Sequence, residues 1–189
     1  MENLAFIGCG RISSKHIEAA LANKERLRLV ACCDPMLERA QRRAREYRAG
    51  LSSGSDVTVY ADYHEMLAKE KPDICAIATE SGYHSRIAID CLEAGAHVIC
   101  EKPMALSMHD ADAMIDAARR NNRKLAVCFQ NRFNAPVQRA RAAREAGRFG
   151  KMLHGMIQVR WNRDEGYYQQ APWRGTWDLD GGTLMNQCT

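Results

Sequence analysis

The sequence of 189 residues has no long apolar run and no block of like charges. A membrane-spanning helix needs about 20 consecutive apolar residues, so we expect no membrane association, and the polar N-terminal residues do not resemble a secretory signal. Lysine and arginine number 27 against 23 acidic residues, which leaves a net charge of +4. Without a basic tract, this mild excess does not predict a nucleic-acid partner.

Cysteine is plentiful, but its usual pairing patterns are missing. The eight cysteines include no C-x-x-C pair, the spacing typical of zinc sites and redox motifs. Several, such as Cys32, Cys75 and Cys100, lie in short apolar segments, where a free thiol serves as a small core residue. We therefore expect free thiols and, since the C-x-x-C spacing is missing, no bound metal. Free thiols fit a reducing compartment, where disulfides are rare, so we expect a cytoplasmic location.

Short apolar segments alternate with amphipathic ones over the first two-thirds of the chain. The apolar segments predict strands at residues 4–8, 27–33, 57–60, 74–79, 97–100 and 125–129. Such alternation is typical of a parallel sheet covered by helices on both faces. The predicted fold class is therefore a doubly wound α/β Rossmann fold, with its ligand at the carboxyl ends of the strands.

The pattern changes after residue 129. Asn134, Ala135 and Pro136 predict the start of another helix, and residues 151–162 alternate well enough to predict one long strand. A single strand cannot bury a core by itself. We therefore predict a dinucleotide-binding domain over residues 1–130 and, over residues 131–189, the incomplete start of an α+β domain with an open antiparallel sheet.

A glycine turn follows the first predicted strand. Gly8 permits the tight turn, and Gly10 lets a pyrophosphate approach the start of a helix, whose amides and dipole attract negative charge. Ser13 takes the position of the third glycine in the usual G-x-G-x-x-G pattern. Asp34 follows Gly10 by 24 residues, near the spacing at which a carboxylate binds the adenosine ribose. The pattern predicts a dinucleotide site; the simpler interpretation is an ordinary turn, with Asp34 as a helix cap.

Glu101, Lys102 and Pro103 directly follow the fifth predicted strand. The proline keeps Lys102 out of helical angles, so the chain turns on the cleft side of the sheet. A lysine placed there can donate to a substrate hydroxyl, and burial lowers a lysine pKa toward values useful in acid–base catalysis. The alternative is a solvated ion pair before a turn.

Several motifs, in this order, resemble the Gfo/Idh/MocA oxidoreductases, the relatives of glucose–fructose oxidoreductase and inositol dehydrogenase. They are G-C-G-R-I-S from Gly8, Cys33-Asp34-Pro35, Ala78-Thr79-Glu80 with His84, Glu101-Lys102-Pro103, Gln130-Asn131-Arg132-Phe133, Trp173-Arg174 and Gly181-Gly182. The resemblance runs along the whole chain. It implies an NAD(P)-dependent dehydrogenase acting on CH–OH groups, with a Rossmann domain followed by an open mixed sheet that builds the substrate pocket and the oligomer contacts.

The resemblance also implies roles for individual residues. Those it places at the cofactor are Gly8, Gly10, Arg11 and Ile12 at the pyrophosphate, Asp34 at the adenosine ribose, and Thr79, His84, Glu101 and Lys102 toward the nicotinamide. Lys102 also reaches the reacting hydroxyl, and the substrate is bordered by Arg132, Trp173 and Arg174. Two alternatives stay open: His84 satisfies a backbone group, and Trp173 is a packing residue. His16 and His64 are expected to be surface or capping residues, and no role is assigned to them.

The sequence departs from the family pattern near its end. The family usually carries a G-G-G-x-x-x-D-x-G-x-H motif, whose aspartate and histidine work with the lysine. Asn186 stands at the aspartate position, where we expect it to act in catalysis by orienting a substrate hydroxyl, although it cannot ionise. The histidine, which is the expected general base, would follow Thr189. We expect a piece of a longer enzyme that binds its cofactor but turns over weakly or not at all. The alternative is a short protein that binds cofactor without turnover.

The expected cofactor is NAD, because the charge of Asp34 would repel the 2′-phosphate of NADP. The following predicted helix is rich in arginine, which is an argument for NADP instead, since one of these side chains can reach the 2′-phosphate. They are Arg39, Arg42, Arg43, Arg45 and Arg48, and most are expected to form a solvated face.

The expected substrate is a sugar, a sugar derivative or a cyclitol, because the family acts mostly on these. The ending with Trp161, Arg163, Tyr167 and Arg174 resembles a branch that oxidises nucleotide sugars, specifically UDP-N-acetylaminosugar uronates at C3. Aromatic rings stack on sugars or uracil, and arginine binds phosphate or carboxylate. The alternatives are a myo-inositol dehydrogenase and a non-catalytic NAD-binding module. The full-length protein is expected to be a homo-oligomer.

Overall fold

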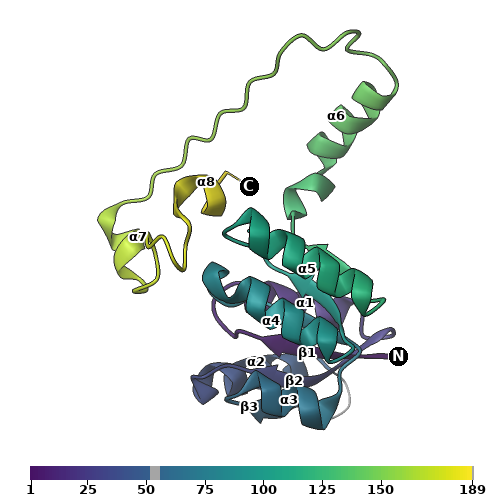
Figure 1. Ribbon diagram of the computed structural model, residues 1–189, viewed down its shortest axis with the longest axis vertical. Coiled ribbons are helices and arrows are strands. Elements are labelled where there is room, and N and C mark those ends of the chain that lie inside the picture. Colours follow the sequence, from purple (N-terminus) through teal and green to yellow (C-terminus); the bar gives the residue numbers. More distant parts are fainter. Residues whose placement is uncertain (52–55, 189) are drawn as a thin grey trace.

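The computed structural model describes residues 1–51 and 56–188 (Figure 1). Its amino-terminal part is built on one six-stranded sheet in the order β3-β2-β1-β4-β5-β6, with every neighbouring pair parallel. The strands are β1 (Glu2–Ile7), β2 (Leu27–Cys33), β3 (Thr58–Tyr60), β4 (Ile74–Ile77), β5 (His97–Cys100) and β6 (Leu125–Val127). All six predicted strands are confirmed to within two residues. The strand order reverses between β1 and β4, which is where such sheets open a ligand cleft.

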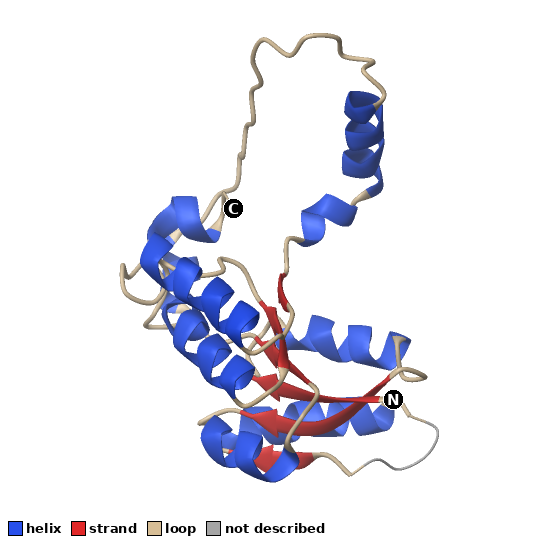
Figure 2. Cartoon of the chain, turned by 45° about the vertical axis from the view of Figure 1, so that its right-hand side comes forward, coloured by secondary structure: helices blue, strands red, loops and turns tan. Residues whose placement is uncertain are grey.

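Helices cover both faces of the sheet (Figure 2). On one face Phe6 and Leu29 pack against Ile17 and Tyr47, from α1 (Ser13–Ala22) and α2 (Leu37–Ala49). On the other face the next residue of β1, Ile7, packs with residues of α3 (Tyr63–Glu70), α4 (His84–Glu93) and α5 (Met108–Arg120). Successive strand residues point to opposite faces, so each strand contributes to both cores, and the predicted doubly wound α/β class is confirmed.

After β6 the chain leaves the sheet. The short helix η2 (Gln130–Phe133) leads into α6 (Ala135–Glu145), and neither has a buried residue. Residues 152–164 then form a long arm without helix or strand, which returns to α7 (Glu165–Gln169) and α8 (Gly182–Asn186) (Figure 1). No helix in the described part of the chain is long and apolar enough to cross a bilayer.

The strand predicted over residues 151–162 is wrong. Every side chain of this segment is exposed, and the segment has no regular structure. The predicted open sheet is likewise absent from the described residues 131–188. A strand is stable only when it is paired and one face is covered, and the described chain places no partner strand beside this segment.

The carboxy-terminal segment, residues 163–188, packs against the carboxyl edge of the sheet. The backbone N–H of Gly82, in η1 (Ser81–Tyr83), donates to the carbonyl oxygen of Leu179 at 3.3 Å. A Cβ added at Gly181 would lie 2.5 Å from Leu106 Cδ2. These close contacts bring α8 to the loop that follows β5.

Candidate functional site

The glycine turn after β1 lies at the switch point of the sheet. Gly8 has a φ of +88°, and a Cβ there would lie 2.6 Å from the backbone of Ala78 and of Thr79. Glycine alone tolerates both conditions. A Cβ on Gly10 would meet no atom within 4 Å, and no side chain caps the N-terminus of α1. The turn therefore leaves open space at a helix N-terminus, which suits a phosphate group.

Asp34 ties the end of β2 to this turn. Its Oδ2 accepts the N–H of Cys9 at 2.9 Å, its Oδ1 accepts the N–H of Met36 at 2.8 Å, and it is 5% exposed. The carboxylate thus holds the turn and the start of the chain after β2. It is not the N-cap of α2, a position held by Met36 without a side-chain hydrogen bond, so the simpler interpretation of Asp34 as a helix cap is wrong. The contact of Asp34 with an adenosine ribose stays a prediction, as do the pyrophosphate contacts of Arg11 and Ile12, which are exposed at the turn.

Arg43 also holds the turn and does not belong to a solvated face. It is 5% exposed, its Nε donates to Ser13 Oγ at 2.7 Å, and its Nη2 donates to the carbonyl oxygen of Gly10 at 2.6 Å. The other four arginines of α2 are exposed, as expected. The signal was present in the sequence, because Arg43 shares the buried stripe of α2 with Ala40, Ala44 and Tyr47, at helical spacing.

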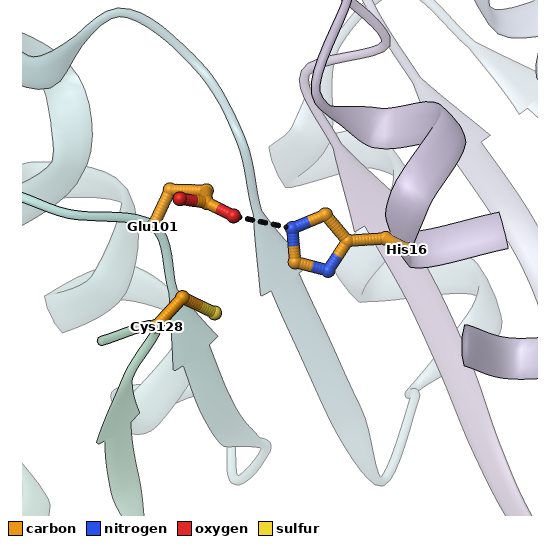
Figure 3. Close-up of side chains that lie close together, drawn as sticks. All are labelled: His16, Glu101 and Cys128. Carbon is orange, nitrogen blue, oxygen red and sulfur yellow. Dashed lines mark hydrogen bonds and ion pairs between the residues drawn. The ribbon is translucent and has the colours of Figure 1, made fainter. Parts of the chain in front are cut away.

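Glu101 leaves β5 at the same edge of the sheet and meets His16 of α1 (Figure 3). Glu101 Oε1 and His16 Nε2 are 2.9 Å apart, and the side chains are 13% and 14% exposed. Burial acts to raise the pKa of Glu101, but His16 and the N–H of Lys102 outweigh it, so the pKa lies below the ordinary 4.5. The thiol of Cys128, just after β6, points into the same space (Figure 3). Burial and the adjacent Glu101 raise the pKa of Cys128 to about 11.

Lys102 is joined to α8 by hydrogen bonds. Its Nζ donates to the carbonyl oxygen of Asn186 and, at 3.4 Å, to Asn186 Oδ1. Asn186 Nδ2 donates to Asp180 Oδ1, and Asp180 Oδ2 accepts the N–H of Gly175 at 2.8 Å. Burial lowers the pKa of Lys102, while Glu101 and Asp180 act in the opposite direction. The two predicted catalytic residues are thus brought together, and Asp180, 3% exposed, joins them although it was not predicted.

His84 connects two loops of the site. Its Nδ1 lies 2.8 Å from the carbonyl oxygen of Pro103, and its Nε2 lies 3.2 Å from that of Thr79. Burial lowers its pKa, against the effect of these carbonyls, and the ring is 1% exposed. Both ring nitrogens thus face acceptors, and a neutral ring can donate to only one of them. These contacts fit the alternative in which His84 satisfies backbone groups; direct contact of His84 or Thr79 with a cofactor stays a prediction.

Two arginines of the carboxy-terminal segment stack on one tyrosine. The guanidinium of Arg174 lies 4.2 Å from the ring centre of Tyr167, and that of Arg163 lies 4.8 Å from it. Arg174 also lies 4.7 Å from the ring of Trp173, and its buried Nε has no hydrogen-bond partner among the described residues. Buried donors are normally paired, so this guanidinium suits an acidic or polar ligand.

Arg132 lies apart from this pair. It is exposed in η2, with its guanidinium 5.8 Å from the ring of Phe129. Within residues 1–51 and 56–188, no hydrogen bond or ring contact joins it to Trp173 or Arg174. The residues predicted for the substrate side are therefore only partly brought together.

Both parts of the chain match models of one protein family. Residues 3–129 match the GFO/IDH/MocA model, described as an oxidoreductase family with an NAD-binding Rossmann fold. Residues 137–189 match the GFO/IDH/MocA C-terminal domain.

Individual relatives show the same likeness. D-glucoside 3-dehydrogenase of Escherichia coli K12 is 33% identical over 149 residues, which are 79% of this chain and 40% of that protein. Inositol 2-dehydrogenase of Salmonella typhimurium is 26% identical over 153 residues, 79% of this chain and 44% of that protein. A crystal structure of the WlbA dehydrogenase from Chromobacterium violaceum, in complex with NADH and UDP-GlcNAcA, is 36% identical with a TM-score of 0.90, covering 99% of this chain and 52% of that chain. The chain thus spans about half the length of these proteins, or less.

Proposed function

Because this chain belongs to the GFO/IDH/MocA oxidoreductase family, whose amino-terminal domain is an NAD-binding Rossmann fold, we propose that the protein uses NAD to dehydrogenate a CH–OH group of a sugar. The observation that carries this proposal is the placement of the open turn at Gly10 and of Lys102 at one edge of the sheet. Residues 1–130 would bind the cofactor, and residues 131–189 would begin the domain that binds the substrate.

The residues at the turn fit a dinucleotide. Gly10 leaves room for a pyrophosphate beside the uncapped start of α1, and Asp34 lies at the end of the neighbouring strand. When bound, NAD supplies the hydride acceptor. The charge of Asp34 favours NAD over NADP, and Arg43 is already engaged by Gly10 and Ser13. Because these contacts occupy its guanidinium, Arg43 is less available to bind a 2′-phosphate.

The chemical role falls to Lys102 and its partners. A secondary alcohol must lose its hydroxyl proton as the hydride leaves. Lys102 would hold that hydroxyl through Nζ, and burial lowers its pKa, which eases the exchange of a proton. Asn186 holds Lys102 in place but cannot ionise. We propose that the general base is the histidine that the family resemblance implies beside this lysine.

For the substrate we propose a nucleotide sugar with an acidic sugar, of the UDP-N-acetylaminosugar uronate kind, oxidised at C3. The support is the stack of Arg163 and Arg174 on Tyr167 and the unpartnered Nε of Arg174, since arginine binds carboxylates and phosphates through several N–H groups. The likeness to a dehydrogenase solved with UDP-GlcNAcA agrees with this. A myo-inositol substrate is the second candidate, favoured by the inositol 2-dehydrogenase relatives, but a neutral cyclitol needs no pair of guanidiniums.

We also propose a cytoplasmic location and a homo-oligomeric full-length protein. The support for the first is that all eight cysteines are free and most are buried, which suits a reducing compartment. The second rests on the family resemblance.

Calorimetric titration of the NADH-bound protein with UDP-GlcNAcA, UDP-GlcNAc and myo-inositol tests the substrate proposal. UDP-GlcNAcA should bind more tightly than UDP-GlcNAc, and Arg174→Met should reduce its affinity about 10- to 100-fold, because a hydrogen bond to a charged group contributes roughly 1.5–3 kcal/mol. Arg160→Met, a change at an exposed arginine of the arm, is the matched control. Binding of myo-inositol without binding of either nucleotide sugar would favour the second candidate.

A further inference from the structure

His16, Glu101 and Cys128 converge at the carboxyl edge of the sheet (Figure 3). They come from α1, the end of β5 and the end of β6, and one ligand atom from each lies within 4.8 Å of the other two. All three side chains are partly buried. We propose that these residues form a binding site for a thiophilic divalent cation such as Zn²⁺, which neither the motifs of the sequence nor the proposed NAD chemistry requires.

The donor set points to zinc among the common cations. Imidazole nitrogen, thiolate sulfur and carboxylate oxygen are the three ligand types that Zn²⁺ accepts, whereas Mg²⁺ and Ca²⁺ prefer oxygen alone. A thiolate and a carboxylate carry two negative charges, which match the charge of the ion. Three protein ligands leave a fourth tetrahedral position for water.

The spacing needs only a small adjustment. Tetrahedral Zn²⁺ with bonds of about 2.0–2.3 Å keeps its ligand atoms roughly 3.3–3.8 Å apart. His16 Nε2 and Glu101 Oε1 are 2.9 Å apart in a hydrogen bond, so they would have to separate by roughly 0.4 Å or more to bind one ion. The whole group lies within 4.8 Å, so Cys128 Sγ would have to approach by about 1 Å, within reach of a side-chain rotation.

The backbone holds the ligands while leaving them accessible. The N–H of Glu101 donates to the carbonyl oxygen of Ile77 at 2.9 Å, and the N–H of Cys128 donates to that of Cys100 at 2.8 Å. The other carboxylate oxygen of Glu101, Oε2, accepts the N–H of Lys102 at 3.3 Å. This hydrogen bond helps to orient the carboxylate, as the outer partners of metal ligands do. The 13–14% exposure of the His16 and Glu101 side chains leaves a path for an ion.

If the protein binds NAD as proposed, occupancy of this site would compete with the cofactor. Glu101 is the residue that the family resemblance places at the nicotinamide ribose, and it cannot serve both ligands. On binding, the thiol of Cys128 gives its proton to the buffer and its sulfur bonds to the ion. The hydrogen bond between His16 Nε2 and Glu101 Oε1 breaks, and the imidazole keeps its proton on Nδ1 so that Nε2 can bind the ion. The protein would therefore be inhibited by Zn²⁺ without a change of fold.

Titration of the full 189-residue chain with Co²⁺, a spectroscopic substitute for Zn²⁺, tests the site. We expect one ion per chain, a sulfur-to-cobalt charge-transfer band, and displacement of Co²⁺ by Zn²⁺. Cys128→Ser should abolish the band, and His16→Gln should weaken binding by at least the roughly 10- to 100-fold lost with an outer partner. Cys188→Ser is the matched control, because it removes an exposed thiol and should leave the band intact.

A band that survives Cys128→Ser, or that disappears in Cys188→Ser, would overturn the site, as would the absence of binding by the unaltered chain. Circular dichroism of each variant separates loss of the site from loss of the fold. Titration of NAD with and without Zn²⁺ then tests the competition. If NAD fails to bind even without Zn²⁺ while the cobalt band is present, the proposed function fails and the metal site stands.

Discussion

Arg43 is a buried positive charge that donates to the carbonyl oxygen of Gly10 and to the hydroxyl of Ser13 in the glycine turn. It also forms an ion pair with Glu46, whose carboxylate lies 2.6 Å from its Nη1. Replacing it with methionine keeps much of its volume but leaves Gly10 O and Ser13 Oγ without these donors. Because hydrogen bonds to charged groups contribute roughly 1.5–3 kcal/mol, Arg43→Met should lower the free energy of unfolding by about 2 kcal/mol and weaken NAD binding. Urea denaturation measures the first effect and calorimetry the second.

The exposed neighbour Arg42 provides the control for this change. Arg42→Met should alter stability by no more than about 0.5 kcal/mol, as is usual for surface substitutions. Equal effects of the two substitutions would contradict the role assigned to Arg43.

Asp180 is a buried carboxylate that helps to set the protonation of Lys102. It raises the pKa of Lys102 against the lowering caused by burial, so removing its charge disfavours the ammonium form. In Asp180→Asn the pKa of Lys102 should therefore fall, and the lysine should react with an amine-specific reagent at lower pH than in the unaltered protein. The pH dependence of labelling at Lys102, followed by mass spectrometry, measures this shift.

The exposed Asp178 is the matched control for Asp180. Asp178→Asn should leave the labelling profile of Lys102 unchanged. A profile in Asp180→Asn that stays the same or moves to higher pH would show that Asp180 does not act on Lys102 as a counter-charge.

At the scale of elements, the turn between β1 and α1 contains two glycines with different demands. Gly8 has a positive φ and lies against the backbone of the loop after β4, whereas Gly10 faces open space. Gly8→Ala should therefore destabilise the fold by about 3 kcal/mol through backbone strain and the forced shift. Gly10→Ala should leave stability nearly unchanged but reduce NAD affinity at least about tenfold, equivalent to about 1.4 kcal/mol.

Thermal denaturation and calorimetry of this pair separate folding from binding. The turn is not the proposed pyrophosphate site if Gly10→Ala binds NAD as tightly as the unaltered protein.

The six strands and the order of helices could be predicted because each is encoded by local periodicity and by turn residues next to it. The strand over residues 151–162 could not, because a strand also needs a partner and the sequence pattern does not say whether one is present. The same distinction applies to the site. Gly8, Gly10 and Lys102 were found from neighbouring residues, but the contacts of Asp180 with Asn186 and of His16 with Glu101 depend on how distant segments pack.

At the scale of the whole molecule, a sheet with two cores is joined to an arm that has none. Backbone without helix or sheet hydrogen bonds is where proteases cut first. Limited trypsin digestion should therefore cleave at Lys151, Arg160 or Arg163, which are exposed in or next to the arm, before it cleaves the exposed arginines of α2. Mass spectrometry should find an amino-terminal fragment that retains the sheet. Early cleavage within α2 would contradict this division of the molecule.

The central claim is that the carboxyl edge of this sheet holds a nicotinamide dinucleotide. Isothermal titration calorimetry of the folded 189-residue chain with NAD, NADH and NADP, in chelator-treated buffer, tests it most directly. The structure predicts binding at one site per chain, with NAD favoured over NADP by the charge of Asp34. A chain that is folded by circular dichroism yet gives no heat with any of the three would contradict the claim.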